Sequence, residues 1–121
     1  RQAFMFAVVE DAHDILVLEV AGDTGFMQEA LASTGASAGK AVLGQTAQAI
    51  VNLKAQLASM GADISDVAKT LCFLTDMGTF ADFNTSYVEG FGESRPARST
   101  IGVAALPAGA AVEIEAWAAK G

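Results

Sequence analysis

The sequence is poor in the side chains that build cross-links and metal sites. It has one cysteine, Cys72, and one histidine, His13, among 121 residues. A single cysteine rules out an internal disulfide, and nothing points to an oxidising compartment, so we expect a cytoplasmic protein. One cysteine and one histidine also argue against a zinc site of the usual ligand types, and no metal is predicted.

Basic charge and long hydrophobic runs are scarce as well. Seven Lys and Arg residues stand against 14 Asp and Glu residues, which gives a net charge of -7. Such a surface repels phosphate backbones, so we expect no nucleic-acid partner, although a local positive pocket for a small anion is compatible with it. No apolar run is long enough to span a bilayer, so no membrane partner is expected. The chain starts at Arg1 without a methionine, which leaves open a targeting segment that has been removed.

What is present indicates one globular domain over residues 1–121. The chain is 52% hydrophobic and 17% charged, which is typical of a packed core and not of a disordered chain. Internal repeats and linkers are absent from the sequence, and it contains no P-loop. Its glycines do not follow a strand and open a helix, as a dinucleotide site requires.

In the first half of the chain, hydrophobic periodicity predicts two strands followed by a helix. The strands are expected over Gln2–Val9 and over Ile15–Ala21. The stretch Phe26–Lys40 shows little periodicity and is predicted to be a loop. A helix is predicted over about Gly44–Met60. Its apolar face would consist of Ile50, Leu53, Leu57 and Met60, and its polar face of Gln45, Gln48, Asn52, Gln56 and Ser59.

The second half of the chain predicts a strand, a helix and two further strands. Gly61 is expected to end the first helix, and "DVAKTLCFLTD" alternates as a strand does. A second helix is predicted to start at Thr79, which would cap it together with Asp82 in a capping box. Strands are expected over Ser99–Ala104 and Ala111–Ala118. Because the short "ALPAG" turn joins them, we predict that these strands are antiparallel neighbours.

This order predicts an α+β fold, with a mixed sheet and two helices on one of its faces. The stretches "ILVLEV" and "TLCFL" are apolar on both faces of their strands. Two helices cover only one face of such a sheet, and an uncovered apolar face would meet water. A second subunit is the simplest cover, so we predict a homo-oligomer.

The segment "RPARSTIG" raises the main chemical question, because Arg98 lies in a small and apolar run. Strand alternation places Arg98 and Thr100 on one face of their strand, and Glu113 and Glu115 on one face of the next. As neighbours, the two strands would let Arg98 and the glutamates line one concavity. An arginine that grips a carboxylate and a glutamate that orients a water would suit hydrolysis of a small carboxylate-bearing substrate. A plain salt bridge from Arg98 to Glu113 or Glu115 is the alternative, which the spacing alone favours.

Three other polar residues are weaker site candidates. Cys72 is interpreted as a core residue, because a free cysteine behaves as a small hydrophobe. His13 lies in the polar "EDAHD" turn and is expected to be solvated. Asn84 lies beside the apolar stripe of the second helix, either as a satisfied buried amide or as a ligand contact. That stripe consists of Phe80, Phe83, Tyr87 and Phe91.

The segment "RPARSTIGVAALPAGAAVEIEAWA" resembles the C-terminal signature of the Rid family, the YjgF-like reactive-intermediate deaminases. "GQTAQAIVNLKAQLASMGADISDVAKTLCFLTDMGTFADFNTSYVEGF" resembles the family's helix, strand and helix, so the match covers about Gly44 to the end. The resemblance implies a homotrimer with a chorismate-mutase-like α+β fold and clefts between subunits. It also implies hydrolysis of 2-imino acids, or of their enamine tautomers, to 2-oxo acids and ammonia. No metal or organic cofactor is implied.

The resemblance also implies roles for particular residues. Arg98 matches the arginine that binds the substrate carboxylate, and Glu113 rather than Glu115 matches the glutamate that orients the water. The further substrate-binding positions that it implies are Asn84 in "DFNTSY", Thr100, and Gly22 in place of the glycine of the family's usual "SGQ". The N-terminal part departs from the family pattern: "SGQ" reads Ala21-Gly22-Asp23, and Val8 replaces a common aromatic residue.

Two other functions compete with deamination. The altered "AGD" segment is compatible with a protein that binds a small carboxylate or acyl ligand in the same cleft without turnover. Ribonuclease activity has been attached to some relatives. The net charge of -7 and the lack of paired histidines argue against it here.

Overall fold

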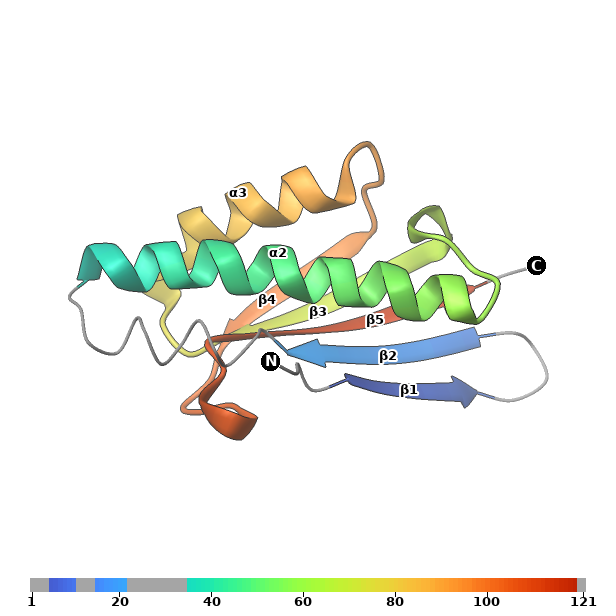
Figure 1. The fold of residues 1–121 in the computed structure, drawn as a ribbon, viewed down its shortest axis with the longest axis horizontal. Helices are drawn as coiled ribbons and strands as arrows, with labels where there is room; N and C mark the ends of the chain where they lie inside the picture. The colour runs from blue at the N-terminus through green and yellow to red at the C-terminus, as the bar shows by residue number, and fades with distance from the viewer. Residues whose placement is uncertain (1–4, 11–14, 22–34, 120–121) are drawn as a thin grey trace.

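The computed structural model describes residues 5–10, 15–21 and 35–119, which form one sheet with two helices against it (Figure 1). This confirms the α+β class. The strands are β1 (Met5–Glu10), β2 (Ile15–Ala21), β3 (Val67–Leu74), β4 (Ala97–Gly102) and β5 (Val112–Ala119). The helices are α2 (Gly35–Ser59) and α3 (Phe80–Phe91), with short 3-10 turns at Ile64–Asp66, Met77–Thr79 and Pro107–Gly109.

The five strands lie in the order β1-β2-β5-β3-β4. Strands β3 and β4 are parallel, and the other neighbouring pairs are antiparallel, so the sheet is mixed as predicted. Helix α3 joins the two parallel strands, because parallel neighbours need a crossover connection. Strands β3, α3 and β4 therefore form a βαβ unit, with β4 at the edge of the sheet (Figure 1).

The predicted pairing of the last two strands is wrong. Strand β3 lies between β4 and β5, so the two are not neighbours. The connection between them passes the end of β3, where the backbone N–H of Val103 donates to Leu74 O (2.9 Å) and that of Thr75 donates to Ala111 O (3.2 Å). The "ALPAG" segment therefore belongs to a crossing loop and does not form a hairpin. Strand β4 also begins and ends two residues earlier than predicted.

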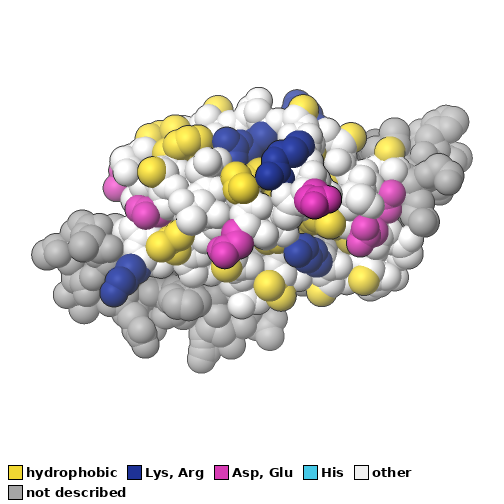
Figure 2. Space-filling view, turned by 90° about the horizontal axis from the view of Figure 1, so that it is seen from above, with side chains coloured by type: hydrophobic (Ala, Val, Ile, Leu, Met, Phe, Trp, Pro, Cys, Tyr) yellow, Lys and Arg dark blue, Asp and Glu magenta, His cyan; other side chains and the backbone are white. Residues whose placement is uncertain are grey.

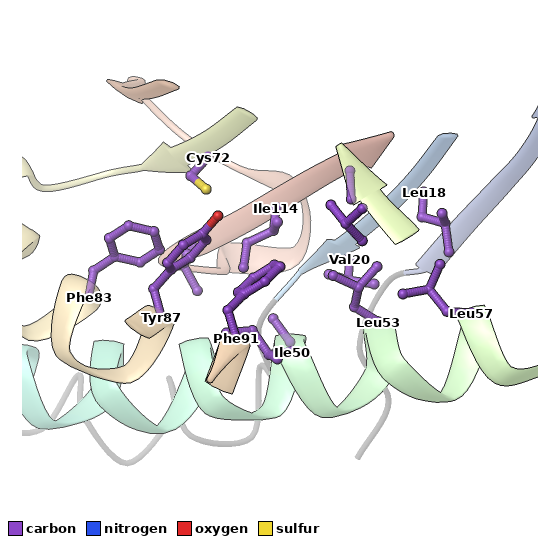
Figure 3. Packing of buried hydrophobic residues seen from close by; sticks show 14 of the residues in the cluster. Leu18, Val20, Ile50, Leu53, Leu57, Cys72, Phe83, Tyr87, Phe91 and Ile114 are labelled. Carbon is purple, nitrogen blue, oxygen red and sulfur yellow. The ribbon is translucent and has the colours of Figure 1, made fainter. Parts of the chain in front are cut away.

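Both helices pack on the same face of the sheet, where one hydrophobic core forms (Figure 3). Burial alternates along β5, where Val112, Ile114 and Ala116 face the helices and the residues between them are half-buried. Strand β3 alternates in the same way from Thr70 to Leu74. The core draws on α2 through Ile50, Leu53 and Leu57, and on α3 through Phe83, Tyr87 and Phe91.

The end of α2 confirms the prediction for Gly61. This glycine has φ of 78°, which residues with a side chain rarely adopt. Its N–H donates to Ala58 O (3.1 Å), and the N–H of Ala62 donates to Leu57 O (2.8 Å). These two bonds form a Schellman motif, which satisfies carbonyl groups left over at a helix end.

The start of α2 differs from the prediction. Residues 35–40 were expected in a loop, yet the helix begins at Gly35. Small residues give this turn no apolar periodicity, but they allow a close approach to α3. A Cβ atom added at Gly39 would lie 2.5 Å from Oδ2 of Asp82, so a side chain there would force Asp82 to shift. The rest of the predicted loop, residues 26–34, lies outside the described residues.

Gln45 was predicted on the polar face of α2, but it is fully buried. It precedes Ala49 and Leu53 by one and two helical turns, so it shares their core-facing stripe. Its Oε1 accepts a hydrogen bond from the backbone N–H of Ala111 (2.9 Å), next to the start of β5. The amide therefore ties α2 to the loop that leads into β5.

The predicted capping box of α3 is also wrong. Thr79 precedes the helix, but its side chain caps none of the helix N–H groups. A 3-10 turn comes first, in which Oδ1 of Asp76 accepts from the N–H of Gly78 (2.8 Å). The hydroxyl of Thr79 donates to Asp76 O (2.6 Å). Asp76 thus caps the 3-10 turn that precedes α3, and α3 itself has no side-chain cap at Thr79.

The face of the sheet away from the helices carries apolar side chains. Leu71, Phe73 and Trp117 are half-buried there, and Ile101 on β4 is 45% exposed. No helix of the described residues covers this face. In those residues, neither helix is both long and apolar enough to cross a membrane.

Candidate functional site

Arg98 lies on the helix side of the edge strand β4. It pairs in register with Thr70 of β3, which is fully buried beneath α3. Its Nη1 donates a hydrogen bond to Oδ1 of Asn84 on α3 (2.7 Å). This contact fixes the side of the sheet on which the guanidinium lies, and it leaves the arginine half-buried between β4 and α3.

Three aromatic rings of α3 surround the Arg98 guanidinium. Its Cζ lies 4.6 Å from the ring centroid of Tyr87, 5.5 Å from that of Phe80 and 5.7 Å from that of Phe83. The rings come from positions three and four residues apart, which share one face of a helix. A cation within about 6 Å of a ring centroid is attracted by the ring quadrupole. The aromatic stripe of α3, which the sequence predicted as core, therefore also forms a wall around the Arg98 guanidinium.

Tyr87 is held from the far side as well. Its hydroxyl lies 2.7 Å from Oγ1 of Thr70, and its ring stacks on Phe91 with centroids 4.4 Å apart. Figure 3 shows the Tyr87 hydroxyl directed from α3 towards the strand that carries Cys72. Burial raises the pKa of Tyr87 above its ordinary value. The phenol therefore stays neutral over the physiological range.

Thr70 was not among the residues that the sequence predicted for the site. Its signal was present, since Thr70 alternates with Cys72 and Leu74 on the apolar face of β3. A polar residue in that position needs a buried partner, which here is Tyr87. Without a way to place α3 over β3, the sequence did not identify that partner.

Cys72 is part of the core, as predicted, and is completely buried. Burial raises the pKa of its thiol to about 11. Its Sγ donates a weak hydrogen bond to Oγ1 of Thr70 (3.9 Å). A thiol that stays protonated at neutral pH is a poor nucleophile, so Cys72 is not a candidate for covalent catalysis.

Thr100 follows Arg98 on the same side of β4 and pairs in register with Cys72. Its Oγ1 is shielded from solvent and makes no hydrogen bond of normal geometry to a described residue, although its interaction with the neighbouring Cys72 thiol lowers the pKa of that thiol. A buried hydroxyl without a partner costs about 1–3 kcal/mol. Thr100 therefore provides an unused polar group two residues from the guanidinium.

Arg98 has no carboxylate partner among the described residues. Asn84 accepts its hydrogen bond, and the surrounding rings carry no formal charge. The salt bridge to Glu113 or Glu115 that the spacing favoured is not formed. The cation is therefore supported by neutral groups, and donors of its guanidinium fork remain for an anion.

Glu113 lies on the opposite face of the sheet from Arg98. It pairs with Phe73 of β3 on one side and with Ala21 of β2 on the other, and it alternates with the core residues Val112 and Ile114. Glu115 shares its face and pairs with Leu71. The expectation that Arg98 and the glutamates line one concavity is thus wrong within a single chain. The insertion of β3, and the opposite orientation of the two side chains, keep them apart.

The remaining candidates lie away from Arg98 or outside the described residues. Gly22 and His13 are in the second group, although Gly22 directly follows Ala21, the residue paired with Glu113. Val8 belongs to β1 and pairs with Val17. In residues 5–10, 15–21 and 35–119, no three His, Cys, Asp or Glu side chains come together as a metal site would need.

The surface above α3 and the edge of the sheet carries both signs of charge. Figure 2 shows basic side chains gathered near the centre of this face, with acidic side chains spaced around them. Charges of both signs are therefore mixed on this face, and Arg98 is the cation whose surroundings the described contacts define.

Comparison with known proteins gives consistent matches. Residues 9–120 match the family model described as endoribonuclease L-PSP. A RutC family protein of Pyrococcus horikoshii is 46% identical over 76 residues, which are 63% of this chain and 60% of that protein. The 2-iminobutanoate/2-iminopropanoate deaminase of Mus musculus is 44% identical over 80 residues, which are 66% of this chain and 59% of that protein. The matched part thus spans about three fifths of these curated relatives.

Solved structures give the same picture for the fold. The crystal structure of RidA from an Antarctic Psychrobacter matches with a TM-score of 0.68 and 31% sequence identity. The match covers 94% of this chain and 85% of that chain.

Proposed function

The chain belongs to the endoribonuclease L-PSP (YjgF/RutC/Rid) family, and on that basis we propose that it hydrolyses 2-imino acids, or their enamine tautomers, to 2-oxo acids and ammonia. The observation that carries the proposal is the half-buried guanidinium of Arg98, which has no carboxylate partner among the described residues. An anionic substrate would supply the missing partner. A mouse relative of similar sequence bears the name of a 2-imino acid deaminase.

Arg98 is the proposed anchor for the substrate carboxylate. A guanidinium presents donors in a planar fork that matches the two oxygens of a carboxylate. Asn84 takes one Nη1 hydrogen and thereby limits rotation of the fork. Thr100, whose Oγ1 has no partner, is the proposed neighbour of the bound substrate.

Glu113 is the proposed general base. Its carboxylate would take a proton from a water whose oxygen attacks the carbon of the protonated imine, which gives a neutral tetrahedral carbinolamine. Returning that proton to the nitrogen makes ammonia the leaving group. The carbon–nitrogen bond then breaks while the carbinolamine hydroxyl gives its proton to the Glu113 carboxylate and becomes the carbonyl. Each step conserves protons and electrons, so the residues need no cofactor for this reaction.

Because Arg98 and Glu113 lie on opposite faces of one sheet, a single protomer does not unite them. We therefore propose that the site is shared: the helix side of β4 of one protomer meets the uncovered sheet face of another. That face carries Leu71, Phe73 and Glu113, so closing the site would also cover apolar surface. A contact between two different surfaces closes into a ring when the rotation permits. The family resemblance favours a homotrimer.

The test is the release of ammonia and 2-oxo acid from imino acids that an amino-acid oxidase generates in situ. Wild type should accelerate the release. Arg98→Ala should lower kcat/KM by an amount equivalent to about 2–5 kcal/mol, the range expected when one charged partner of a buried pair is removed. Lys54→Ala is a suitable control, because it removes an exposed cation from the C-terminal half of α2. Equal rates for wild type and Arg98→Ala would refute the proposal.

A second candidate function is binding of a small carboxylate or acyl ligand without turnover. The "AGD" segment, which departs from the family's usual "SGQ", begins at Ala21, which pairs with Glu113. The segment that carries Arg98 follows the family pattern. Calorimetry that shows binding of 2-oxobutanoate, together with imine hydrolysis at the background rate, would favour this function over deamination.

A further inference from the structure

Tyr87 differs from the rest of the aromatic stripe of α3 by one hydroxyl group. The other three members, Phe80, Phe83 and Phe91, are phenylalanines. The tyrosine is also the member whose ring centroid lies nearest to the Arg98 guanidinium, at 4.6 Å. The hydroxyl makes one contact, with Oγ1 of Thr70 at 2.7 Å, and this contact is buried.

These contacts form a closed circuit of three residues. Thr70 on β3 pairs in register with Arg98 on β4, the Thr70 hydroxyl meets that of Tyr87 on α3, and the Tyr87 ring meets the guanidinium. An arginine side chain has several rotatable bonds, and a bidentate clamp works only when its plane is held. These three contacts hold the Tyr87 ring in a fixed orientation relative to β3 and β4. Arg98 projects from β4.

Resting on the proposed role of Arg98, we propose that Tyr87, held by Thr70, is a positioning residue for the guanidinium plane. Its ring lies against the arginine, and we assign it no contact with the substrate. Loss of the Tyr87–Thr70 hydrogen bond would let the ring tilt and the fork turn away from the carboxylate. The grip on the substrate carboxylate persists through the reaction, so weakening it affects substrate and transition state alike and changes KM rather than kcat.

The test compares KM and kcat for Tyr87→Phe, Thr70→Val and the double variant. Each single change removes the same hydrogen bond, so we expect KM to rise about 3- to 10-fold in each, with kcat within about twofold of wild type. The double variant should be no worse than the singles, because the pair shares one interaction. Thr70→Ser keeps the hydroxyl and should restore the wild-type KM. If no turnover is found, the Kd for 2-oxobutanoate replaces KM as the readout.

Ser86→Ala provides a matched control. Ser86 lies one residue before Tyr87 and is buried, but its hydroxyl donates to Leu43 O of α2 (2.8 Å) and not to the sheet. The variant therefore removes a comparable hydrogen bond of α3 without touching the circuit. We expect a similar loss in thermal midpoint and an unchanged KM.

Values of KM for Tyr87→Phe and Thr70→Val equal to that for Ser86→Ala would overturn the inference. Arg98→Ala separates this failure from failure of the proposed function. If Arg98→Ala loses binding while Tyr87→Phe does not, only the positioning role fails. If Arg98→Ala behaves as wild type, the anchor itself is wrong.

Discussion

Arg98 and Glu113 lie on opposite faces of one sheet, with β3 between the strands that carry them. Arg98 is beside Thr70, which faces the helices, and Glu113 is beside Phe73, which faces away from them. The two residues proposed for carboxylate binding and for water activation are therefore separated within one protomer. The proposed site therefore requires a second copy, whose Glu113 would lie beside this Arg98.

The shared site predicts that two inactive variants complement each other. Arg98→Ala removes one wall and Glu113→Gln removes the other, so each alone should be inactive. In co-expressed mixed oligomers, random assembly at equal amounts should leave about one quarter of the sites with both wild-type walls. The measurement is imine hydrolysis by the purified mixture. Activity no higher than that of either parent would show that both residues act from the same protomer.

Replacing buried, unpartnered hydroxyls should stabilise the protein. Oγ1 of Thr46 and Oγ1 of Thr100 are both shielded, and neither has a hydrogen-bond partner within residues 5–10, 15–21 and 35–119. Valine has the same shape and no hydroxyl, so Thr46→Val and Thr100→Val should each raise the free energy of unfolding by about 0.5–1 kcal/mol. Denaturant titration measures this.

The two threonine variants should differ in activity. Thr46 lies on α2 away from Arg98, whereas Thr100 is two residues from it. If the Thr100 hydroxyl serves the substrate, Thr100→Val alone lowers kcat/KM, by about fivefold for one neutral hydrogen bond. Equal kcat/KM values for Thr46→Val and Thr100→Val would show that the Thr100 hydroxyl does not serve the substrate.

The buried thiol of Cys72 should lower the free energy of unfolding at alkaline pH. Burial raises the pKa of its thiol from 9.0 to about 11, so between these values the unfolded chain releases a proton that the folded chain retains. The free energy of unfolding should therefore be unaffected by this group below pH 9. It should fall by about 2 kcal/mol as the pH rises to about 11. Urea titrations at several pH values measure the slope.

Cys72→Val should lack this part of the slope. Burial and the charge of the Cys72 thiolate both raise the pKa of Tyr87, so the Tyr87 contribution should also be somewhat smaller in the variant. The native thiol should also resist alkylation by iodoacetamide at pH 8, and react once urea unfolds the chain. Rapid alkylation of the folded protein would contradict the buried position of Cys72.

Gly90 should prove intolerant of a side chain. A Cβ atom there would lie 2.7 Å from Cδ1 and 2.9 Å from Cγ2 of Ile50, where α2 and α3 touch. Gly90→Ala should therefore lower the free energy of unfolding by about 1–3 kcal/mol, as overpacking does. Adding Ile50→Val, which removes Cδ1, should recover part of the loss. If the stability losses of Gly90→Ala and Ile50→Val simply add in the double variant, Ile50 is not the side chain that the new methyl group strains.

Patterns that act over short stretches of sequence predicted much of the fold. The Ile15–Ala21 strand has the predicted bounds, and the glycine stop at Gly61 follows from local backbone geometry. The stripe of α3 was found because Phe80 to Phe91 repeats with helical spacing. The count of two helices correctly indicated that one face of the sheet is not covered by the described helices, while the homo-oligomer inferred from the apolar content of that face stays a prediction.

The wrong predictions concern positions whose structure depends on contacts with residues that are distant in the sequence. Gly35–Lys40 is helical, and the close approach of Gly39 to Asp82 of α3 is a contact that no periodicity of the sequence records. The place of β4 depends on α3 carrying the chain back beside β3, which a short turn before β5 does not reveal. Gln45 is buried because Ala111, far along the chain, supplies a donor. The same limitation hid the Tyr87–Thr70 contact and the separation of Arg98 from Glu113.

The βαβ unit has a consequence for how the protein changes over time. Thr70, Tyr87 and Arg98 come one each from β3, α3 and β4, three successive elements of the chain. Strand β5 holds Glu113 beside the end of β2, so that wall depends on pairing with the distant N-terminal part. In the proposed site, substitutions near Ala21 would act on the wall that carries Glu113 and would leave the Arg98 anchor unchanged. Under that proposal, substrate choice would diverge in evolution while the binding of the substrate carboxylate is inherited.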